Sequence, residues 1–205
     1  QLSGRNGYRE ASALLKALDH PAVQPVMQRV SQRRIQYLAV AFRSLGLARR
    51  ERSQTESVEL VAFTRSFVSE YAENHPLETD VLKAVHEGTR VVAMVDPQHL
   101  HQVLTVLVHN ALTYGRNPGQ PAQVTVAVHR DVSQNLPMIE VVDRGPGIPP
   151  RVVEQIFTPF FSTSDHGTGL GLYIARQLCE ANQSSLGFEP VPGGGYRYYR
   201  DDRLG

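Results

Sequence analysis

The sequence of 205 residues contains a single cysteine, Cys179. An intramolecular disulfide framework is therefore excluded, which fits a reducing compartment, and we expect this cysteine to be packed inside the protein. The chain also lacks an excess of charge of either sign, because 21 Lys and Arg residues stand against 20 Asp and Glu residues, for a formal net charge of +1. This balance argues against nucleic acid or a lipid surface as a partner.

Long hydrophobic runs are missing as well. The longest apolar runs, such as residues 103–108, fall far short of the roughly 18 residues that a membrane span requires. The first residues, QLSGRNG, do not resemble a signal peptide. With 41% hydrophobic and 20% charged residues, the chain has the composition of a folded globular protein. We expect it to be soluble and cytoplasmic, with no membrane contact of its own.

Two helical patterns at the start of the chain predict a hairpin. Apolar residues recur every three or four positions in residues 11–18 and 23–45, on either side of a break at residues 19–21. Because two such helices cannot bury their apolar stripes alone, we expect a second copy to complete a four-helix bundle, so that the protein is a homodimer. We assign residues 1–52 to this dimerisation hairpin and residues 53–205 to a second domain.

The second domain mixes helical and strand patterns without the regular alternation of a doubly wound sheet. We therefore predict an α+β protein whose second domain is an α/β sandwich with a mostly antiparallel sheet. The expected elements are a strand end and helix over 58–71, two strands over 81–95, a helix over 97–114, strands over 123–130 and 138–142, a loop-rich span over 144–167, a helix from about 171, and closing strands over 185–189 and 196–199.

Three glycines on alternate positions, Gly167, Gly169 and Gly171, lead into the last helical pattern. Glycine lets a backbone approach a ligand closely, and the first N–H groups of a helix attract an anion such as phosphate. The dinucleotide-binding fingerprint requires glycine where Leu172 stands, and the Walker and protein-kinase patterns are also missing. If this loop holds a phosphate, another nucleotide-binding fold supplies it.

In the helix predicted over residues 97–114, one side-chain amide lies at the boundary between the apolar and polar faces. Asn110 lies at the edge of the apolar stripe, and Tyr114 lies within the stripe. A carboxamide oxygen there could ligate Mg²⁺. An isolated Asn at such an edge is more often hydrogen-bonded to neighbouring backbone. The stripe consists of Leu100, Val103, Leu104, Leu107, Val108 and Ala111.

A carboxylate follows the strand predicted over residues 138–142. Asp143, Gly145 and Gly147 form the pattern D-x-G-x-G. A carboxylate at this place could accept the exocyclic N–H of adenine, and it would repel the carbonyl oxygen that guanine presents there. Taken alone, the pattern is more often a turn, because Asp, Gly and Pro are turn residues.

Three aromatic residues, Phe157, Phe160 and Phe161, precede a segment of small polar residues that ends at the glycines. Aromatic side chains normally belong to a core. Here they could anchor a lid whose polar tip closes over a nucleotide. His166 stands beside the glycines and could touch the same ligand.

Taken together, these motifs resemble the N, G1, F and G2 boxes of the catalytic domain of sensor histidine kinases, in the same order and at similar spacing, over about residues 58–195. The resemblance implies the ATP-binding fold shared with gyrase, Hsp90 and MutL, with ATP and Mg²⁺ as cofactors. Asn110 would be the Mg²⁺ ligand and catalytic residue, and Asp143 would bind adenine. The implied nucleotide-binding residues are Asn110, Tyr114, Asp143, Gly145, Gly147, Ile148, Phe157, Gly167, Thr168, Gly169, Leu170, Gly171 and Leu172.

The resemblance further implies an ATP-dependent protein histidine kinase. The γ-phosphoryl group would pass in line to an imidazole nitrogen, with positioning and metal charge as the main sources of catalysis. It would then pass to an aspartate of a response regulator. The chain would be the cytoplasmic portion of a membrane sensor.

Four departures from the family pattern bear on this hypothesis. Val106 stands where related ATPases place a water-activating Glu, which argues against direct hydrolysis of ATP. Thr113 replaces a basic residue that would contact phosphate, and Arg116 could substitute for it. The last predicted strand, over residues 196–199, lacks the apolar residues that usually end this domain in the family. A phosphoacceptor His followed by an acidic residue and Asn-Pro is missing, so we expect the chain to bind ATP without labelling itself. A GHKL-type ATPase and a phosphotransfer-inactive module for dimerisation and regulator binding remain as alternatives.

Overall fold

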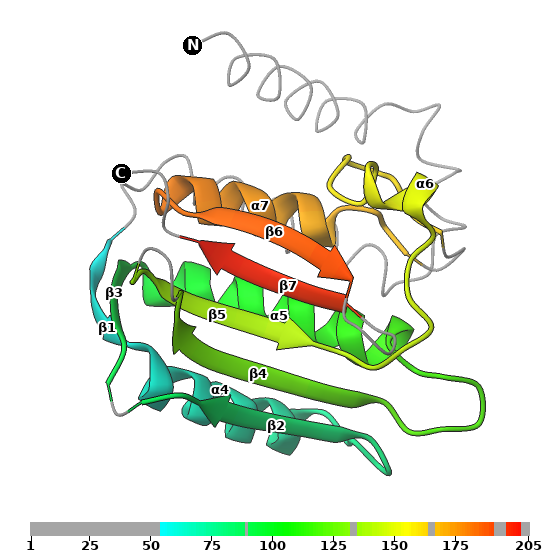
Figure 1. Ribbon diagram of the computed structural model, residues 1–205, viewed down its shortest axis with the longest axis horizontal. Coiled ribbons are helices and arrows are strands. Elements are labelled where there is room, and N and C mark those ends of the chain that lie inside the picture. The colour runs from blue at the N-terminus through cyan, green and yellow to red at the C-terminus, as the bar shows by residue number, and fades with distance from the viewer. Residues whose placement is uncertain (1–53, 89, 132–134, 164–166, 191–195, 202–205) are drawn as a thin grey trace, which may run out of the picture.

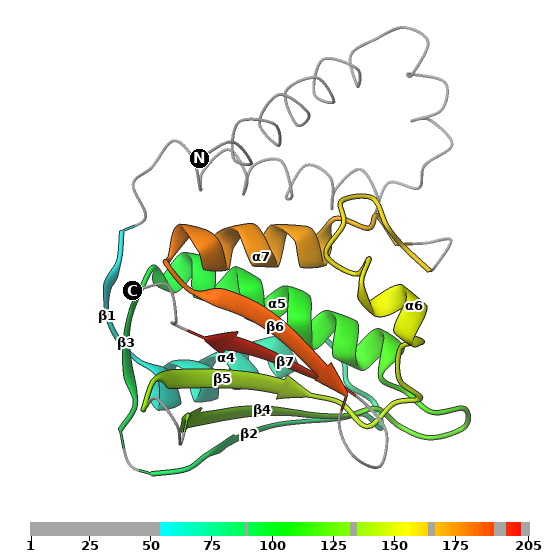
Figure 2. The same ribbon diagram turned by 45° about the horizontal axis from the view of Figure 1, so that its top comes forward.

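The computed structural model describes residues 54–88, 90–131, 135–163, 167–190 and 196–201. Within them, helices α4, α5 and α7 cover one face of a five-stranded sheet, and a two-stranded sheet lies at one end (Figures 1 and 2). The helices are α4 (Leu60–Asn74), α5 (Pro97–Tyr114), the short α6 (Pro150–Val153) and α7 (Gly171–Ala181). The large sheet runs in the order β2 (Val81–His86), β4 (Gln123–Arg130), β5 (Pro137–Val142), β7 (Tyr196–Asp201) and β6 (Ser185–Pro190), and the small sheet pairs β1 (Glu56–Glu59) with β3 (Val92–Val95).

The sheet is mostly antiparallel, as the sequence predicted. Only β2 and β4 pair in parallel among the described strands of the large sheet, and the other neighbours are antiparallel. The two strands predicted over residues 81–95 are both present, but they belong to different sheets, because β3 pairs with β1 and not with β2. The predicted α/β sandwich is therefore confirmed.

The core lies between the helices and the large sheet. On β4, Val124, Val126 and Val128 are buried while the residues between them are less so, which is the alternation of a strand with one covered face. On α5, the whole predicted apolar stripe is buried. Cys179 is buried on α7, as expected.

The last helix, α7, packs against a neighbouring helix as well as against the large sheet. Its residues Ile174, Ala175 and Leu178 are buried, but α7 contacts both α5 and β6, so part of its apolar face covers a neighbouring helix and not the sheet. Gly171, at its first position, faces α5, where an added Cβ would lie 3.2 Å from Cγ1 of Val106. The start of α7 is thereby held against the middle of α5.

The start of α5 is fixed by the buried side chain of Asp96. Its Oδ1 accepts hydrogen bonds from the N–H groups of Gln98 and His99, at 2.9 and 3.3 Å, and so caps the helix. Its Oδ2 accepts from the N–H of Gln54 at 3.0 Å. The N–H of Asp96 donates to Oδ1 of Asn182 at 2.7 Å. One residue thus joins α5, the entry of the chain into this domain and the end of α7.

We expect Asp96→Ala to lower the free energy of unfolding by about 2–3 kcal/mol, because a helix cap and the hydrogen bond from the N–H of Gln54 to a charged carboxylate are both lost. Urea unfolding followed by circular dichroism measures this change. Glu56→Ala, which removes an exposed carboxylate from β1, is the control and should change stability by less than about 0.5 kcal/mol. A loss for Asp96→Ala as small as that of the control would contradict the network.

Two further expectations concern the dimerisation hairpin and contact with a membrane. The predicted dimerisation hairpin at residues 1–52 lies outside the described residues. Among the helices that the structure describes, none has both the length and the apolar character needed to cross a membrane.

Candidate functional site

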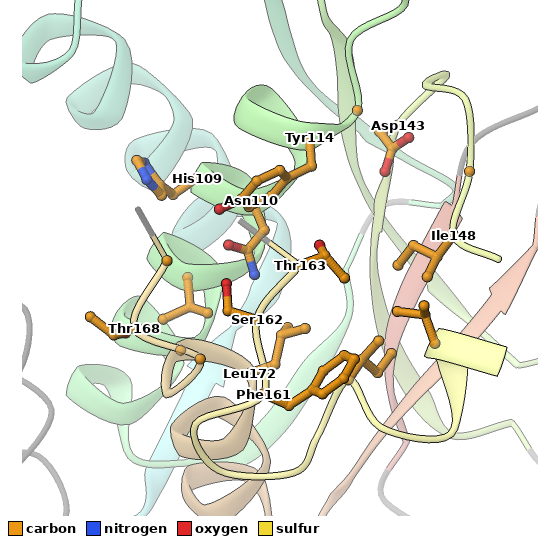
Figure 3. A pocket seen from close by; sticks show the side chains of 18 of the residues that line it. His109, Asn110, Tyr114, Asp143, Ile148, Phe161, Ser162, Thr163, Thr168 and Leu172 are labelled. Atoms are coloured by element: carbon orange, nitrogen blue, oxygen red, sulfur yellow. The ribbon is translucent and has the colours of Figure 1, made fainter. Parts of the chain in front are cut away.

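A cavity of about 620 Å³ lies between the second half of α5, the loop after β5, α6 and the segment that leads into α7 (Figure 3). This volume is typical of small-molecule sites, which span roughly 300–1,000 Å³. Predicted site residues that line it are Asn110, Tyr114, Asp143, Gly147, Ile148, Gly167, Thr168, Gly169, Gly171 and Leu172. Segments that are far apart in the sequence therefore meet at one cavity.

Asn110 and Asp143 lie on different walls of this cavity. Asn110 is half-buried on α5, and its carboxamide projects into the cavity toward Ser162 (Figure 3). Asp143 follows β5, where its side chain is almost fully buried, and its Oδ1 accepts a hydrogen bond from the N–H of Gly145 at 2.9 Å. An amide and a carboxylate thus face one shared space, which can hold a ligand with a hydrogen-bond donor at one end and a metal-bound anion at the other.

The segment that contains Gly167, Gly169 and Gly171, called the glycine segment below, approaches other backbone very closely at Gly169. Gly169 has a φ of +67°, and a Cβ placed on it would lie 2.4 Å from the carbonyl carbon of Phe160. The carbonyl oxygen of Gly169 also accepts a hydrogen bond from the N–H of Phe160 at 2.9 Å. At Gly169 the close neighbour is the backbone of Phe160 and Phe161, and the close approach of these glycines to a ligand stays a prediction.

We expect Gly169→Ala to weaken nucleotide binding by roughly tenfold, because the alanine is strained at positive φ and pushes the phenylalanine segment away from the cavity wall. Calorimetric titration with a non-hydrolysable ATP analogue measures the change. Gly88→Ala is a matched control, since Gly88 also has a positive φ but no atom lies within 4 Å of its added Cβ. Equal losses of affinity in both variants would show that the contact with Phe160 is unimportant.

Three predicted residues do not line the cavity. Leu170 is buried in the core, and its N–H donates to Oγ1 of Thr168 at 3.4 Å, within the protein. Phe157 packs on the core, with the guanidinium of Arg176 5.4 Å from its ring centroid. Gly145 lies behind Asp143, against Gly115. These residues support the wall from behind.

Two further expectations are wrong. Tyr114 was expected within the buried stripe of α5, but it is 51% exposed, because it is the last residue of the helix and extends beyond the layer that covers the stripe. It still lines the cavity. Arg116, expected as a substitute for the basic residue missing at Thr113, pairs with Asp80 and is not among the described lining residues. His166 lies outside the described residues.

The aromatic lid anchors behave differently from one another. Phe161 lines the cavity and is half-buried. Phe160 is 48% exposed and has a φ of +67°, an uncommon conformation for an aromatic residue. Phe157 alone among the three packs on the core. Residues 157–161 are therefore anchored to the core at Phe157 and reach the cavity at Phe161.

Sequence reasoning missed a group of aromatic and imidazole side chains on the cavity wall. Tyr71 and His75, at the end of α4, line the cavity with their rings stacked at a centroid distance of 4.2 Å. Thr105 and His109 line it from α5. Desolvation, and then the nearby His75, lower the pKa of His109 from its ordinary value, so the imidazole is neutral near pH 7. A signal was present, because Thr105, Val106, His109 and Asn110 recur at helical spacing on one face.

The family of histidine kinase-, DNA gyrase B- and HSP90-like ATPases matches residues 95–199, a range that includes both Asn110 and Asp143. The chain belongs to this family, and this region is an ATPase domain of the sensor histidine kinase type. A curated relative is the sensor protein kinase PilS of Pseudomonas aeruginosa, which is 36% identical over 151 residues. That match covers 74% of the chain but only 28% of PilS, so the chain spans much less than the length of this relative.

Solved structures of histidine kinases share the fold. The nucleotide-free catalytic domain of histidine kinase ThkA superposes with a TM-score of 0.61 and 24% identity, over 72% of the chain and 93% of that domain. ThkA in complex with the response regulator protein TrrA gives a TM-score of 0.66 and 20% identity, over 96% of the chain and 57% of ThkA. At these identities the likeness establishes the fold alone.

Proposed function

We propose that the chain binds ATP with Mg²⁺ and transfers the γ-phosphoryl group to a histidine, as the kinase core of a two-component sensor. The observation that carries this proposal is the shared cavity of about 620 Å³ that contains Asn110, Asp143 and the glycine segment. These residues occupy the positions that the family resemblance assigns to the metal, the adenine and the phosphates.

Asp143 would recognise adenine. One of its oxygens is held by the N–H of Gly145, which fixes the direction of the carboxylate. The adenine amino group would donate to this carboxylate, whereas guanine would present a carbonyl oxygen and be repelled. Burial strengthens both effects, because an unmatched polar contact away from water costs more than one in water.

The donor set fits magnesium held together with phosphates. Among the described residues there is no cluster of three His, Cys, Asp or Glu side chains that could hold a metal ion. Mg²⁺ usually keeps several waters and binds through one or two protein oxygens plus substrate phosphates. The carboxamide oxygen of Asn110 would be such a ligand, and the bound ion would neutralise charge on the triphosphate.

The phosphates would lie near the start of α7. Gly167, Thr168, Gly169 and Gly171 line the cavity there, and the first turn of a helix carries unpaired N–H groups and a partial positive charge. In the reaction the bond between the γ-phosphorus and the bridging oxygen breaks, a phosphorus–nitrogen bond to imidazole forms, and ADP leaves. The acceptor imidazole loses its proton to an acidic neighbour.

The partners follow from the same proposal. The hairpin at residues 1–52 would make a homodimer, and the phosphoryl group would pass to an aspartate of a response regulator. The similarity to PilS supports a PilR-like regulator of type IV pilus gene expression, and the complex of ThkA with a response regulator supports this class of partner. We place the chain in the cytoplasmic portion of an inner-membrane sensor, where ATP is available.

A transferase is favoured over an ATPase that releases phosphate. Val106 lines the cavity four residues before Asn110, where a hydrolytic enzyme of this family would need its base. Asp143 carries the only carboxylate among the described residues that line the cavity, and it is assigned to adenine. The cavity therefore offers no second carboxylate, within the described residues, to activate water.

Calorimetry with AMP-PNP and Mg²⁺ tests nucleotide binding directly. We expect saturable heat at one site per chain, and absence of heat would favour a degenerate module for dimerisation and regulator binding. Incubation with ATP and a supplied helical domain that carries an acceptor His tests transfer. Steady release of phosphate without that domain would favour the ATPase alternative, and stable labelling of this chain by itself would contradict the missing acceptor.

A further inference from the structure

We propose that the loop between α5 and β4, residues 115–122, positions Asp143 for base recognition, and that Asn117 is the positioning residue. This inference rests on the proposed role of Asp143. Neither Gly115 nor Asn117 belongs to the motifs that predicted the site. Both lie where the end of α5 meets the turn after β5.

The first observation is an interlock of two glycines. A Cβ on Gly115 would lie 2.5 Å from Cβ of Asp143, and a Cβ on Gly145 would lie 2.5 Å from Cα of Gly115. Real Cβ atoms do not approach other carbons so closely, and closely packed backbone has no room to shift. The turn that carries Asp143 therefore lies directly against the end of α5.

The second observation is a hydrogen bond across this contact. Nδ2 of Asn117 donates to the carbonyl oxygen of Arg144 at 2.8 Å. Arg144 stands between Asp143 and Gly145, whose N–H donates in turn to Oδ1 of Asp143. A displacement of this backbone would therefore move both the carboxylate and the group that orients it.

Residues 115–122 are themselves held in place by contacts with Asp80, so the backbone of Asn117 has a fixed position. Asp80, just before β2, pairs with Arg116 through Oδ2, and its Oδ1 accepts from the N–H of Ala122 at 2.8 Å. The N–H of Gln120 donates to the carbonyl oxygen of Asn117 at 3.1 Å and closes a turn. A side chain on such an anchored turn restrains the backbone that it contacts.

The test compares two nucleotides that differ in the base. We expect Asn117→Ala to weaken AMP-PNP binding by roughly three- to tenfold while GMP-PNP binding changes by less than about twofold, because one hydrogen bond that orients the adenine acceptor is lost. Asn117→Asp, which has the same shape but no donor, should do the same. Calorimetry measures AMP-PNP, and displacement of a fluorescent ATP analogue measures GMP-PNP.

A matched control removes a similar bond elsewhere. Asn74 also donates from Nδ2 to one backbone carbonyl, that of Glu70, at 2.9 Å, and Asn74→Ala should leave both affinities unchanged. Thermal unfolding of each variant separates loss of stability from loss of positioning, since a merely structural role would weaken both nucleotides equally. Gly115→Ala is the stronger variant and should abolish AMP-PNP binding if it folds.

The outcomes separate the two proposals. Wild-type protein that binds AMP-PNP and an Asn117→Ala variant that keeps the wild-type ratio of affinities would overturn the positioning role and leave the proposed function intact. Wild-type protein that binds neither nucleotide would overturn both. A selective loss for AMP-PNP in the two Asn117 variants supports both.

Discussion

Asn110→Ala is expected to slow phosphoryl transfer to a supplied histidine domain by roughly a hundred- to a thousandfold, the size seen when a group that stabilises transition-state charge is removed. The reason is that the carboxamide oxygen is lost from a cavity with few other candidate ligands. Asp143 lies on another wall, and no cluster of three acidic or imidazole side chains is present among the described residues. The phosphates would then lack a protein-held ion.

Transfer rates at saturating ATP over a series of Mg²⁺ concentrations measure this effect. Asn110→Asp should be less severe, because it keeps an oxygen ligand but places a negative charge near the triphosphate. Gln98→Ala, at the exposed start of α5, is the control and should transfer at the wild-type rate. An Asn110→Ala variant with full activity at ordinary Mg²⁺ would remove this residue from the site.

The parts of the fold that sequence predicted well are those encoded locally. Asp96 and Pro97 mark the start of α5, and its apolar stripe recurs at helical spacing, so the helix and its buried face could be read directly. In the D-x-G-x-G pattern and among the alternate glycines, Gly147 and Gly169 have φ of +90° and +67°, a conformation that glycine adopts far more readily than other residues. Such signals depend only on neighbours in the chain.

The remaining parts depend on which segments pack together, which a single sequence does not encode locally. The assignment of β2 and β3 to different sheets follows from the pairing of β3 with β1. The stacked Tyr71 and His75 reach the cavity because the end of α4 lies beside α5 there. Periodicity also placed Tyr114 on a buried stripe, since it gives direction around a helix but not where the covering layer ends.

The interlock of Gly115 with Gly145 shows the same limit more sharply. Gly115 belongs to no motif and Gly145 was predicted only from the D-x-G-x-G pattern, so the need for glycine at both positions appears only when the two backbones meet. Arg116 illustrates the reverse case, because its position suggested a phosphate contact while its partner, Asp80, lies in a distant segment. Whether Arg116 can take over the phosphate contact that is missing at Thr113 depends on which groups its guanidinium already binds, and the sequence alone does not show this.

Asp143→Asn should weaken AMP-PNP binding by roughly 30-fold, the size of a lost charge-assisted hydrogen bond. In the wild type, Oδ1 accepts from the N–H of Gly145, and under the proposed function the carboxylate would also accept from adenine. Asparagine has a single side-chain oxygen. Whichever donor keeps that oxygen, the other one faces an NH₂ group, so either the turn or the base loses its partner.

The same substitution should change the choice of base. An NH₂ group turned toward the cavity donates to the carbonyl of guanine, so GMP-PNP should bind more tightly to Asp143→Asn than to the wild type, while AMP-PNP binds less tightly. Competition titrations with both analogues measure this reversal. Glu154→Gln removes one carboxylate charge from an exposed position just after α6, and should alter neither affinity. If Asp143→Asn instead lowers both affinities equally, the carboxylate supports the fold of the turn and does not read the base.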